Sequence, residues 1–176
     1  MAETLVGPTR CSHYVDFEYS VHTCPSAVLR EVAGVFPDQR EAILSKDPSG
    51  NSALLIVPTF QKAAASLLSW GDVQAAEKDR LLEEFLRWSK QVCDVLWAQG
   101  YWADVTDPCT GLPYYGTAGA QIYSDVHANM TILKYETENV GGCVVMAHPE
   151  WKYASYPATL FTTAPLETLH QALAST

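Results

Sequence analysis

The first clear pattern in the chain is an alternation of apolar and polar side chains near the N-terminus. The apolar members of this alternation are separated by polar ones, in the order Val15, Asp16, Phe17, Glu18, Tyr19, Ser20, Val21, His22. A period of two is typical of a strand with one buried face. A continuous apolar run at residues 53–57 predicts a second, buried strand. Pro58 is expected to keep the far end of that strand away from the sheet centre, because proline cannot donate a hydrogen bond to a neighbouring strand.

Apolar side chains spaced three and four residues apart predict the helices. Pro25 begins the first one, at a position where its missing N–H does no harm, and Pro37 ends it. The longest pattern runs from Asp72 to Gln99, and Gly100 follows at the place of a C-terminal cap. A short helix that carries leucines at 166, 169 and 173 closes the chain. The long helix is expected to bury one face and to form the spine of the core.

The C-terminal half is predicted to contain a long loop and three short strands. Residues 100–119 combine aromatic residues, prolines and glycines, which is typical of a loop. Strands are expected at about 131–136, 143–148 and 157–163. The order of elements predicts a single α+β domain with an antiparallel-rich sheet and flanking helices. We assign residues 1–12 to a short N-terminal tail and residues 13–176 to the domain.

Charge narrows the classes of partner. The net charge is −9 and only 11 residues are Lys or Arg, so no basic stripe is available for nucleic acid or an anionic membrane. A basic protein surface would be attracted instead. No apolar stretch reaches the roughly 20 residues that span a bilayer, and no secretory signal is visible. We therefore expect a cytoplasmic protein with free thiols.

The five cysteines offer one candidate for chemistry, Cys143. It follows Gly141 and Gly142 at the start of a predicted strand, and the glycines would let a large ligand or partner approach the thiol. A thiolate is a soft ligand for late transition metals, although a small buried cysteine is the alternative. Cys143 and His148 cannot form a dyad on one strand, because five residues put them on opposite faces and roughly 16 Å apart.

The remaining candidates have simpler interpretations. His22 and Cys24 could share one face of a strand, but two ligands alone do not make a metal site. Cys93 is expected in the core and Cys109 in an exposed turn. We also find no catalytic triad and no phosphate or dinucleotide motif.

The aromatic loop raises the question of an interface. Trp102 is expected to pack onto the protein's own core. For Tyr114 and Tyr115, a partner interface and a core position both remain open.

Three segments of the chain resemble the C-terminal domain of the CblD family in their order and spacing. They are Thr23-Cys24-Pro25 with Phe36-Pro37, the stretch from Gly100-Tyr101-Trp102-Ala103-Asp104 to Gly116, and Gly141, Cys143, Val145, His148 and Trp151. The resemblance implies a nitroreductase-like α+β fold without flavin, and an adaptor in cobalamin trafficking that is not itself an enzyme. It also implies docking on a CblC-like chaperone that holds cobalamin, which is then directed to methionine synthase and methylmalonyl-CoA mutase.

The resemblance assigns the cobalt-contacting role to the segment around Cys143, with one departure. The family commonly has two adjacent cysteines, and here Gly142 stands at the first position. Gly141, Gly142 and Cys143 are therefore the candidate cobalamin-binding residues, and Cys143 is the candidate cobalt ligand. Whether Cys143 replaces the missing thiol or the protein works by docking alone stays open. A longer native N-terminus would add a mitochondrial location to the cytoplasmic one.

Two other classes of function remain as alternatives. The implied fold permits a nitroreductase-type flavoenzyme, but a flavin phosphate favours basic residues, which are sparse here. A thiol enzyme that uses Cys143 would need a base from elsewhere, and the unplaced histidines are His13, His22, His127 and His170.

Overall fold

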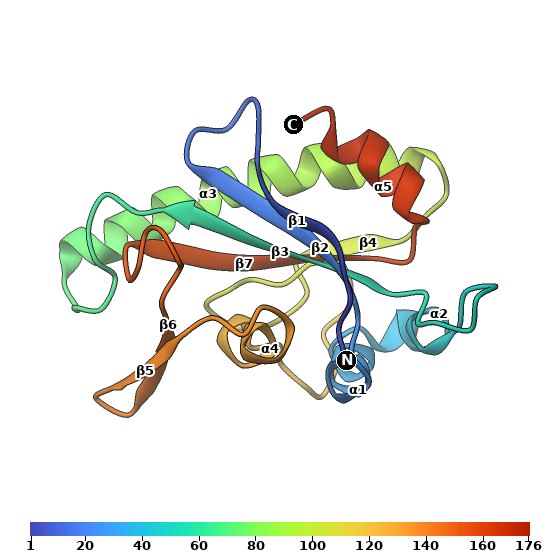
Figure 1. Ribbon diagram of the computed structural model, residues 1–176, viewed down its shortest axis with the longest axis horizontal. Helices are drawn as coiled ribbons and strands as arrows, with labels where there is room; N and C mark the ends of the chain where they lie inside the picture. The colour runs from blue at the N-terminus through green and yellow to red at the C-terminus, as the bar shows by residue number, and fades with distance from the viewer.

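A five-stranded sheet forms the centre of the computed structural model, which describes residues 1–176 (Figure 1). Every pair of neighbouring strands is antiparallel. Across the sheet, the strands follow the order β1 (Thr4–Arg10), β2 (Phe17–Thr23), β3 (Leu55–Lys62), β7 (Ser155–Thr162) and β4 (Ala103–Val105). The predicted single α+β domain with an antiparallel sheet and flanking helices is confirmed. The likeness to flavin nitroreductases stays a prediction.

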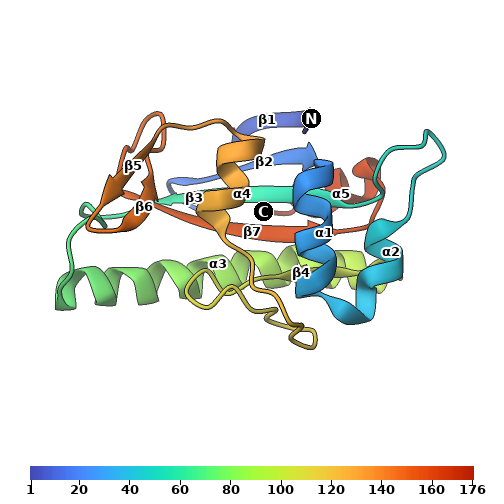
Figure 2. The ribbon, with the colours of Figure 1, turned by 90° about the horizontal axis from the view of Figure 1, so that it is seen from below.

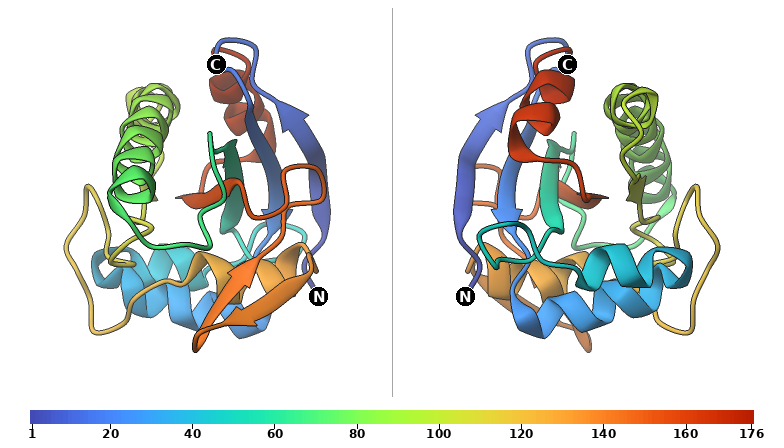
Figure 3. Two further views of the ribbon diagram at one scale, coloured as in Figure 1. Left: turned by 90° about the vertical axis from the view of Figure 1, so that its left-hand side faces the viewer. Right: turned by 90° about the vertical axis from the view of Figure 1, so that its right-hand side faces the viewer.

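Helices cover both faces of the sheet, as Figures 2 and 3 show. The long helix α3 (Asp72–Ala98) and the last helix α5 (Leu166–Leu173) pack on one face, where the largest hydrophobic cluster lies. The other face carries α1 (Ser26–Val35), the short turn η1 (Pro37–Gln39), α2 (Arg40–Leu44) and α4 (Asp125–Ile132). The predicted first, long and last helices are confirmed. None of the helices combines the length and the apolar character needed to cross a bilayer.

Strand β3 corrects the expectation about Pro58. It continues through Pro58 to Lys62 and lies between β2 and β7 in the middle of the sheet. Pro58 is tolerated because the β2–β3 pairing is interrupted opposite it, between the pairs Tyr19–Thr59 and His22–Ile56. A proline at such a gap costs no ladder hydrogen bond.

The segment assigned to an N-terminal tail contains an ordered strand. Thr4–Arg10 forms β1, the edge strand beside β2, and its pairing is irregular between Thr4 and Thr9. Gly7 and Pro8 fall within this irregular stretch and hide the strand in the sequence, because neither residue supports a regular alternation.

The C-terminal half differs most from the prediction. Helix α4 was not predicted, and its last residues fall where a strand was expected at 131–136, so that prediction is wrong. A separate two-stranded hairpin follows, made of β5 (Thr137–Val140) and β6 (Cys143–Met146), and it projects from the body in Figure 1. The predicted strands at 143–148 and 157–163 correspond to β6 and β7. The predicted loop at 100–119 includes the short strand β4.

Candidate functional site

The candidate thiol lies at the tip of the β5–β6 hairpin. Val140 pairs with Cys143, which leaves Gly141 and Gly142 as a two-residue turn. Their φ angles are +59° and +87°, in the left-handed region that glycine adopts without a steric cost. The glycines are thus required by the turn itself. A side chain built on either glycine would meet no other atom within 4 Å, so the approach to the tip is also open.

Cys143 is exposed, and the hairpin register decides which side chains share its face. Side chains alternate along a strand and directly paired residues lie on one face, so Cys143 is grouped with Val140, Glu138 and Val145. On this face the Tyr153 hydroxyl donates to a Glu138 carboxylate oxygen at 2.5 Å. The opposite face carries Met146, which is buried against Phe60 and Trp151. The base of the hairpin is therefore packed onto the body while its thiol tip stays in solvent.

A groove of about 630 Å³ adjoins the hairpin. Its walls come from five segments: the β3–α3 connection with the first part of α3, the 108–111 turn, the start of α4 with the residues before it, β6, and the start of β7 with the turn before it. Three large apolar side chains at the groove are well exposed: Trp70 at 86%, Ile122 at 61% and Val144 at 47%. Exposed apolar area of this kind on a concave surface is typical of a binding site.

A buried polar pair sits at the end of the groove where α4 begins. Asp125 is 6% exposed, and its Oδ1 accepts a hydrogen bond from the Thr159 hydroxyl at 2.5 Å. Burial raises the pKa of Asp125 to about 6, and the Thr159 hydrogen bond opposes this effect. The buried hydroxyl of neighbouring Tyr123 has no hydrogen-bond partner, and burial raises its pKa well above the usual value. Buried polar atoms therefore lie beneath the apolar rim at this end of the groove.

The other cysteines are divided between the core and the groove. Cys93 is fully buried on α3, as predicted, and burial raises its pKa. Burial raises the pKa of Cys24 to about 12 and that of Cys11 to about 11, so neither thiol ionises readily. Cys109 is exposed, as predicted, and lines the groove. Cys109 and Cys143 are therefore the two exposed thiols of the chain.

His148 has a structural position that sequence analysis did not identify. Its Nε2–H donates to Glu18 on β2 at 3.0 Å, and its Nδ1 accepts the backbone N–H groups of Glu150 and Trp151, both at 3.2 Å. Its ring also stacks on Trp151 with the centroids 4.4 Å apart. These contacts fasten the turn after the hairpin to the sheet, so His148 is committed to the fold and does not reach the exposed thiol.

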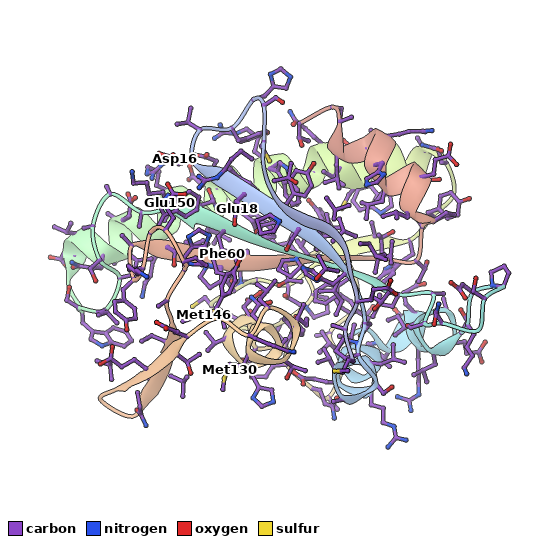
Figure 4. All side chains as sticks on the ribbon, viewed as in Figure 1. Asp16, Glu18, Phe60, Met130, Met146 and Glu150 are labelled. Carbon is purple, nitrogen blue, oxygen red and sulfur yellow. The ribbon has the colours of Figure 1, made fainter.

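Arg10 on β1 contacts the side chains that surround His148. Its guanidinium lies 4.1 Å from the centre of the Trp151 ring and forms ion pairs with Glu18 and Glu150. Figure 4 shows Glu18 and Glu150 together with Asp16, which precedes β2, and places Phe60 between them and Met146 at the base of the hairpin. The only sequence signal for the cluster was the polar Glu18 within an alternating strand. Its partner His148 is 130 residues away along the chain, so the local pattern could not reveal the contact.

His22 and Cys24 do not form a metal site. His22 is buried, and both of its ring nitrogens lie within hydrogen-bond distance of hydroxyl groups, from Ser20 and Thr4. Burial lowers the pKa of His22 to about 4. No group of three or more His, Cys, Asp or Glu side chains is arranged to hold a metal ion.

The aromatic loop is anchored to the body by Asp104. Its carboxylate, which is 1% exposed, accepts the backbone N–H groups of Val105, Tyr115 and Gly116. Trp102 packs edge-on against Phe36, as expected of a core residue.

Tyr114 and Tyr115 are both exposed, and Tyr115 is packed against the body. The Tyr115 ring packs edge-on against Trp97 at 4.9 Å and is 36% exposed. Tyr114, at 50%, contacts Tyr115 and is the more exposed of the two. Tyr115 is thus an exposed residue with a ring contact to Trp97, and the choice between a core and an interface role stays a prediction for both tyrosines.

Comparison with known proteins defines the class to which this α+β domain with a projecting thiol hairpin belongs. Residues 8–173 match the family of the methylmalonic aciduria and homocystinuria type D protein, so the chain belongs to that family. The chain is 29% identical to the cobalamin trafficking protein CblD of Rattus norvegicus over 147 residues. The same protein of Homo sapiens is 27% identical, and that of Gallus gallus 24% identical, over the same length. The matched region covers 84% of this chain and 46% of each relative, so the chain spans about half the length of these relatives.

Proposed function

We propose that this protein takes part in cobalamin trafficking as an adaptor, which docks on a CblC-type chaperone and presents Cys143 to the cobalt of the cobalamin that the chaperone holds. The relatives are cobalamin trafficking proteins, and this supports the trafficking role. The observation that carries the finer proposal is the exposed Cys143 at the tip of a projecting hairpin with an unobstructed turn. Transfer onward to methionine synthase and methylmalonyl-CoA mutase belongs to the same proposal.

The hairpin suits this task in two respects. Its tip is exposed and narrow, so it can enter a cavity on a partner, and the two turn residues have no side chains that would meet the corrin ring. A cysteine thiolate is also a soft donor that matches a late transition metal such as cobalt. Position 142 lies in the turn, whereas Cys143 is the first residue of β6 and pairs with Val140. The absence of a cysteine at position 142 is therefore compatible with this role. Residence in the cytoplasm, and in mitochondria if the native N-terminus is longer, stays a prediction.

The experiment is a spectroscopic titration of a cobalamin-loaded CblC-type chaperone. Wild type and Cys109→Ser should produce the absorbance change of a thiolate bound to cobalt, and Cys143→Ser should not. Cys109 is the matched control because it is the second exposed thiol of the chain. If Cys143→Ser retains the change, or if wild type never shows it, the proposed cobalt contact is wrong.

A further inference from the structure

The hairpin next to the groove has an unpaired backbone edge. Strand β6 pairs only with β5, so one side of β6 has no neighbouring strand. The Ala147 N–H donates to the Glu136 carbonyl at 2.8 Å, which fixes the phase of the ladder. In an antiparallel pair, hydrogen-bonded and non-hydrogen-bonded residue pairs alternate. Glu138–Val145 and Val140–Cys143 are therefore the bonded pairs, and the N–H and C=O groups of Val144 and Met146 point away from β5.

This free edge of β6 lies along the groove. Val144, Val145 and Met146 all line the groove, whereas no residue of β5 does. Figure 2 shows the hairpin at the same end of the molecule as the beginning of α3, which forms the opposite wall. A free strand edge therefore lies beside an apolar groove, and this is the arrangement in which an extended peptide adds a strand to a sheet.

The side chains of the groove indicate what kind of segment fits. Trp70, Val144 and Ile122 are large, apolar and exposed, so they can receive alternate apolar side chains of a strand. Lys78 is the only basic residue among the lining, and its ammonium group lies over the Trp70 ring. The lining also contains Asp79 and Asp125, and the chain as a whole carries a net charge of −9. Apolar and basic residues in alternation are the complementary pattern.

We propose that an extended, basic segment of the partner protein lies in this groove and adds to β6 as a third strand of the hairpin sheet. The inference rests on the proposed adaptor function, because the partner that it specifies is the cobalamin-loaded chaperone. A second copy of this chain is disfavoured as the occupant, since it would bring a further net charge of −9 to an acidic surface. Pairing at β6 would also hold Cys143, the residue before Val144, in a fixed position relative to the partner.

The hairpin supplies a matched pair of variants for the test. Asn139 and Val144 face each other at one non-hydrogen-bonded position of the ladder. Proline at either residue removes one outward N–H and leaves the internal hydrogen bonds of the hairpin in place. Val144→Pro removes the donor on the groove edge, and Asn139→Pro removes its counterpart on the opposite edge. Each variant is titrated calorimetrically against the cobalamin-loaded CblC-type chaperone, and Val144→Thr controls for the change of side chain.

The expected result is a loss of affinity of about tenfold for Val144→Pro. This is the effect of losing one backbone hydrogen bond to the partner strand and weakening the hydrogen bonds next to it. Asn139→Pro should bind like wild type, and Val144→Thr should lose clearly less affinity than Val144→Pro, because it keeps the outward N–H. In parallel, amide hydrogen exchange of wild type should slow at Val144 and Met146 when the complex forms. If Val144→Pro does not fold, the hydrogen exchange of wild type is sufficient to test whether the partner pairs with β6.

Each other outcome overturns the inference. Wild-type binding by Val144→Pro, or unchanged exchange at Val144 in the complex, would place the partner elsewhere while leaving the adaptor function intact. A dimer of this chain that Val144→Pro dissociates would make a second copy the occupant. Absence of any complex with wild type would instead remove the proposed function as well.

Discussion

Asp125 gives the most quantitative prediction, because its carboxyl group is buried with a single side-chain hydrogen bond. Its pKa is raised from 3.8 to about 6, with burial as the main cause. The folded protein therefore binds the proton more tightly than the unfolded chain does. Between these two values the folded state carries more protons, so stability must fall as the pH rises.

The expected size of this effect follows from the two pKa values. A separation of roughly two pH units at about 1.4 kcal/mol per unit gives a loss of about 3 kcal/mol between about pH 4 and about pH 6. The substitution Asp125→Asn removes the titration and keeps an oxygen that can accept the Thr159 hydrogen bond. It also removes a negative charge from the first turn of α4, which costs about 0.3–1 kcal/mol. The variant should therefore be about 2 kcal/mol more stable than wild type at neutral pH.

Urea unfolding at several pH values measures this difference directly. The free energy of unfolding of wild type minus that of Asp125→Asn should become more negative from about pH 4 to about pH 6 and then stay constant. Asp79→Asn is the matched control for the loss of a carboxylate, because this exposed residue lines the same groove. Parallel pH profiles for wild type and Asp125→Asn would refute the reasoning.

Three further substitutions test the structural roles assigned to the site. His148→Ala should lower the free energy of unfolding by about 2–4 kcal/mol, because Glu18 and two backbone N–H groups lose their partner; an unchanged urea midpoint would contradict this role. Gly142→Val should destabilise the hairpin by about 1–2 kcal/mol at φ +87°, seen as faster amide exchange confined to the hairpin; unchanged exchange would count against the turn geometry. Tyr115→Ala should lower stability by about 1–2 kcal/mol through its lost contact with Trp97, with partner binding unchanged; weaker binding at an unchanged melting temperature would mark Tyr115 as an interface residue instead.

Hydrophobic periodicity predicted the helices whose buried face is mainly apolar. Helix α3 is the clearest case, since Leu81, Phe85 and Val92 repeat at helical spacing and are all buried. Helix α4 was missed because half of its buried residues are polar. Asp125 and Asn129 share its inner face with Ala128 and Ile132, so no apolar stripe exists for the pattern to detect. The N-cap Ser124, whose hydroxyl accepts the His127 N–H, was the only local signal for this helix.

The candidate site could be predicted only in part, for a related reason. Gly141, Gly142 and Cys143 attracted attention as a sequence motif, but the turn that explains the glycines depends on the pairing of β5 with β6. The groove beside them combines segments from residues 67 to 157, and its shape depends on how these segments pack. The His148–Glu18 contact likewise depends on long-range packing. Local patterns carry no information on such contacts.

The most direct test of the central claim is the identity of the atoms bound to cobalt when this protein meets the loaded chaperone. X-ray absorption at the cobalt edge detects a sulfur ligand independently of changes in the visible spectrum. We expect a sulfur atom bound to cobalt in the mixture with wild type and with Cys109→Ser, and its absence with Cys143→Ser. A cobalt that keeps only nitrogen, oxygen and carbon ligands in a proven wild-type complex would contradict the assignment of Cys143.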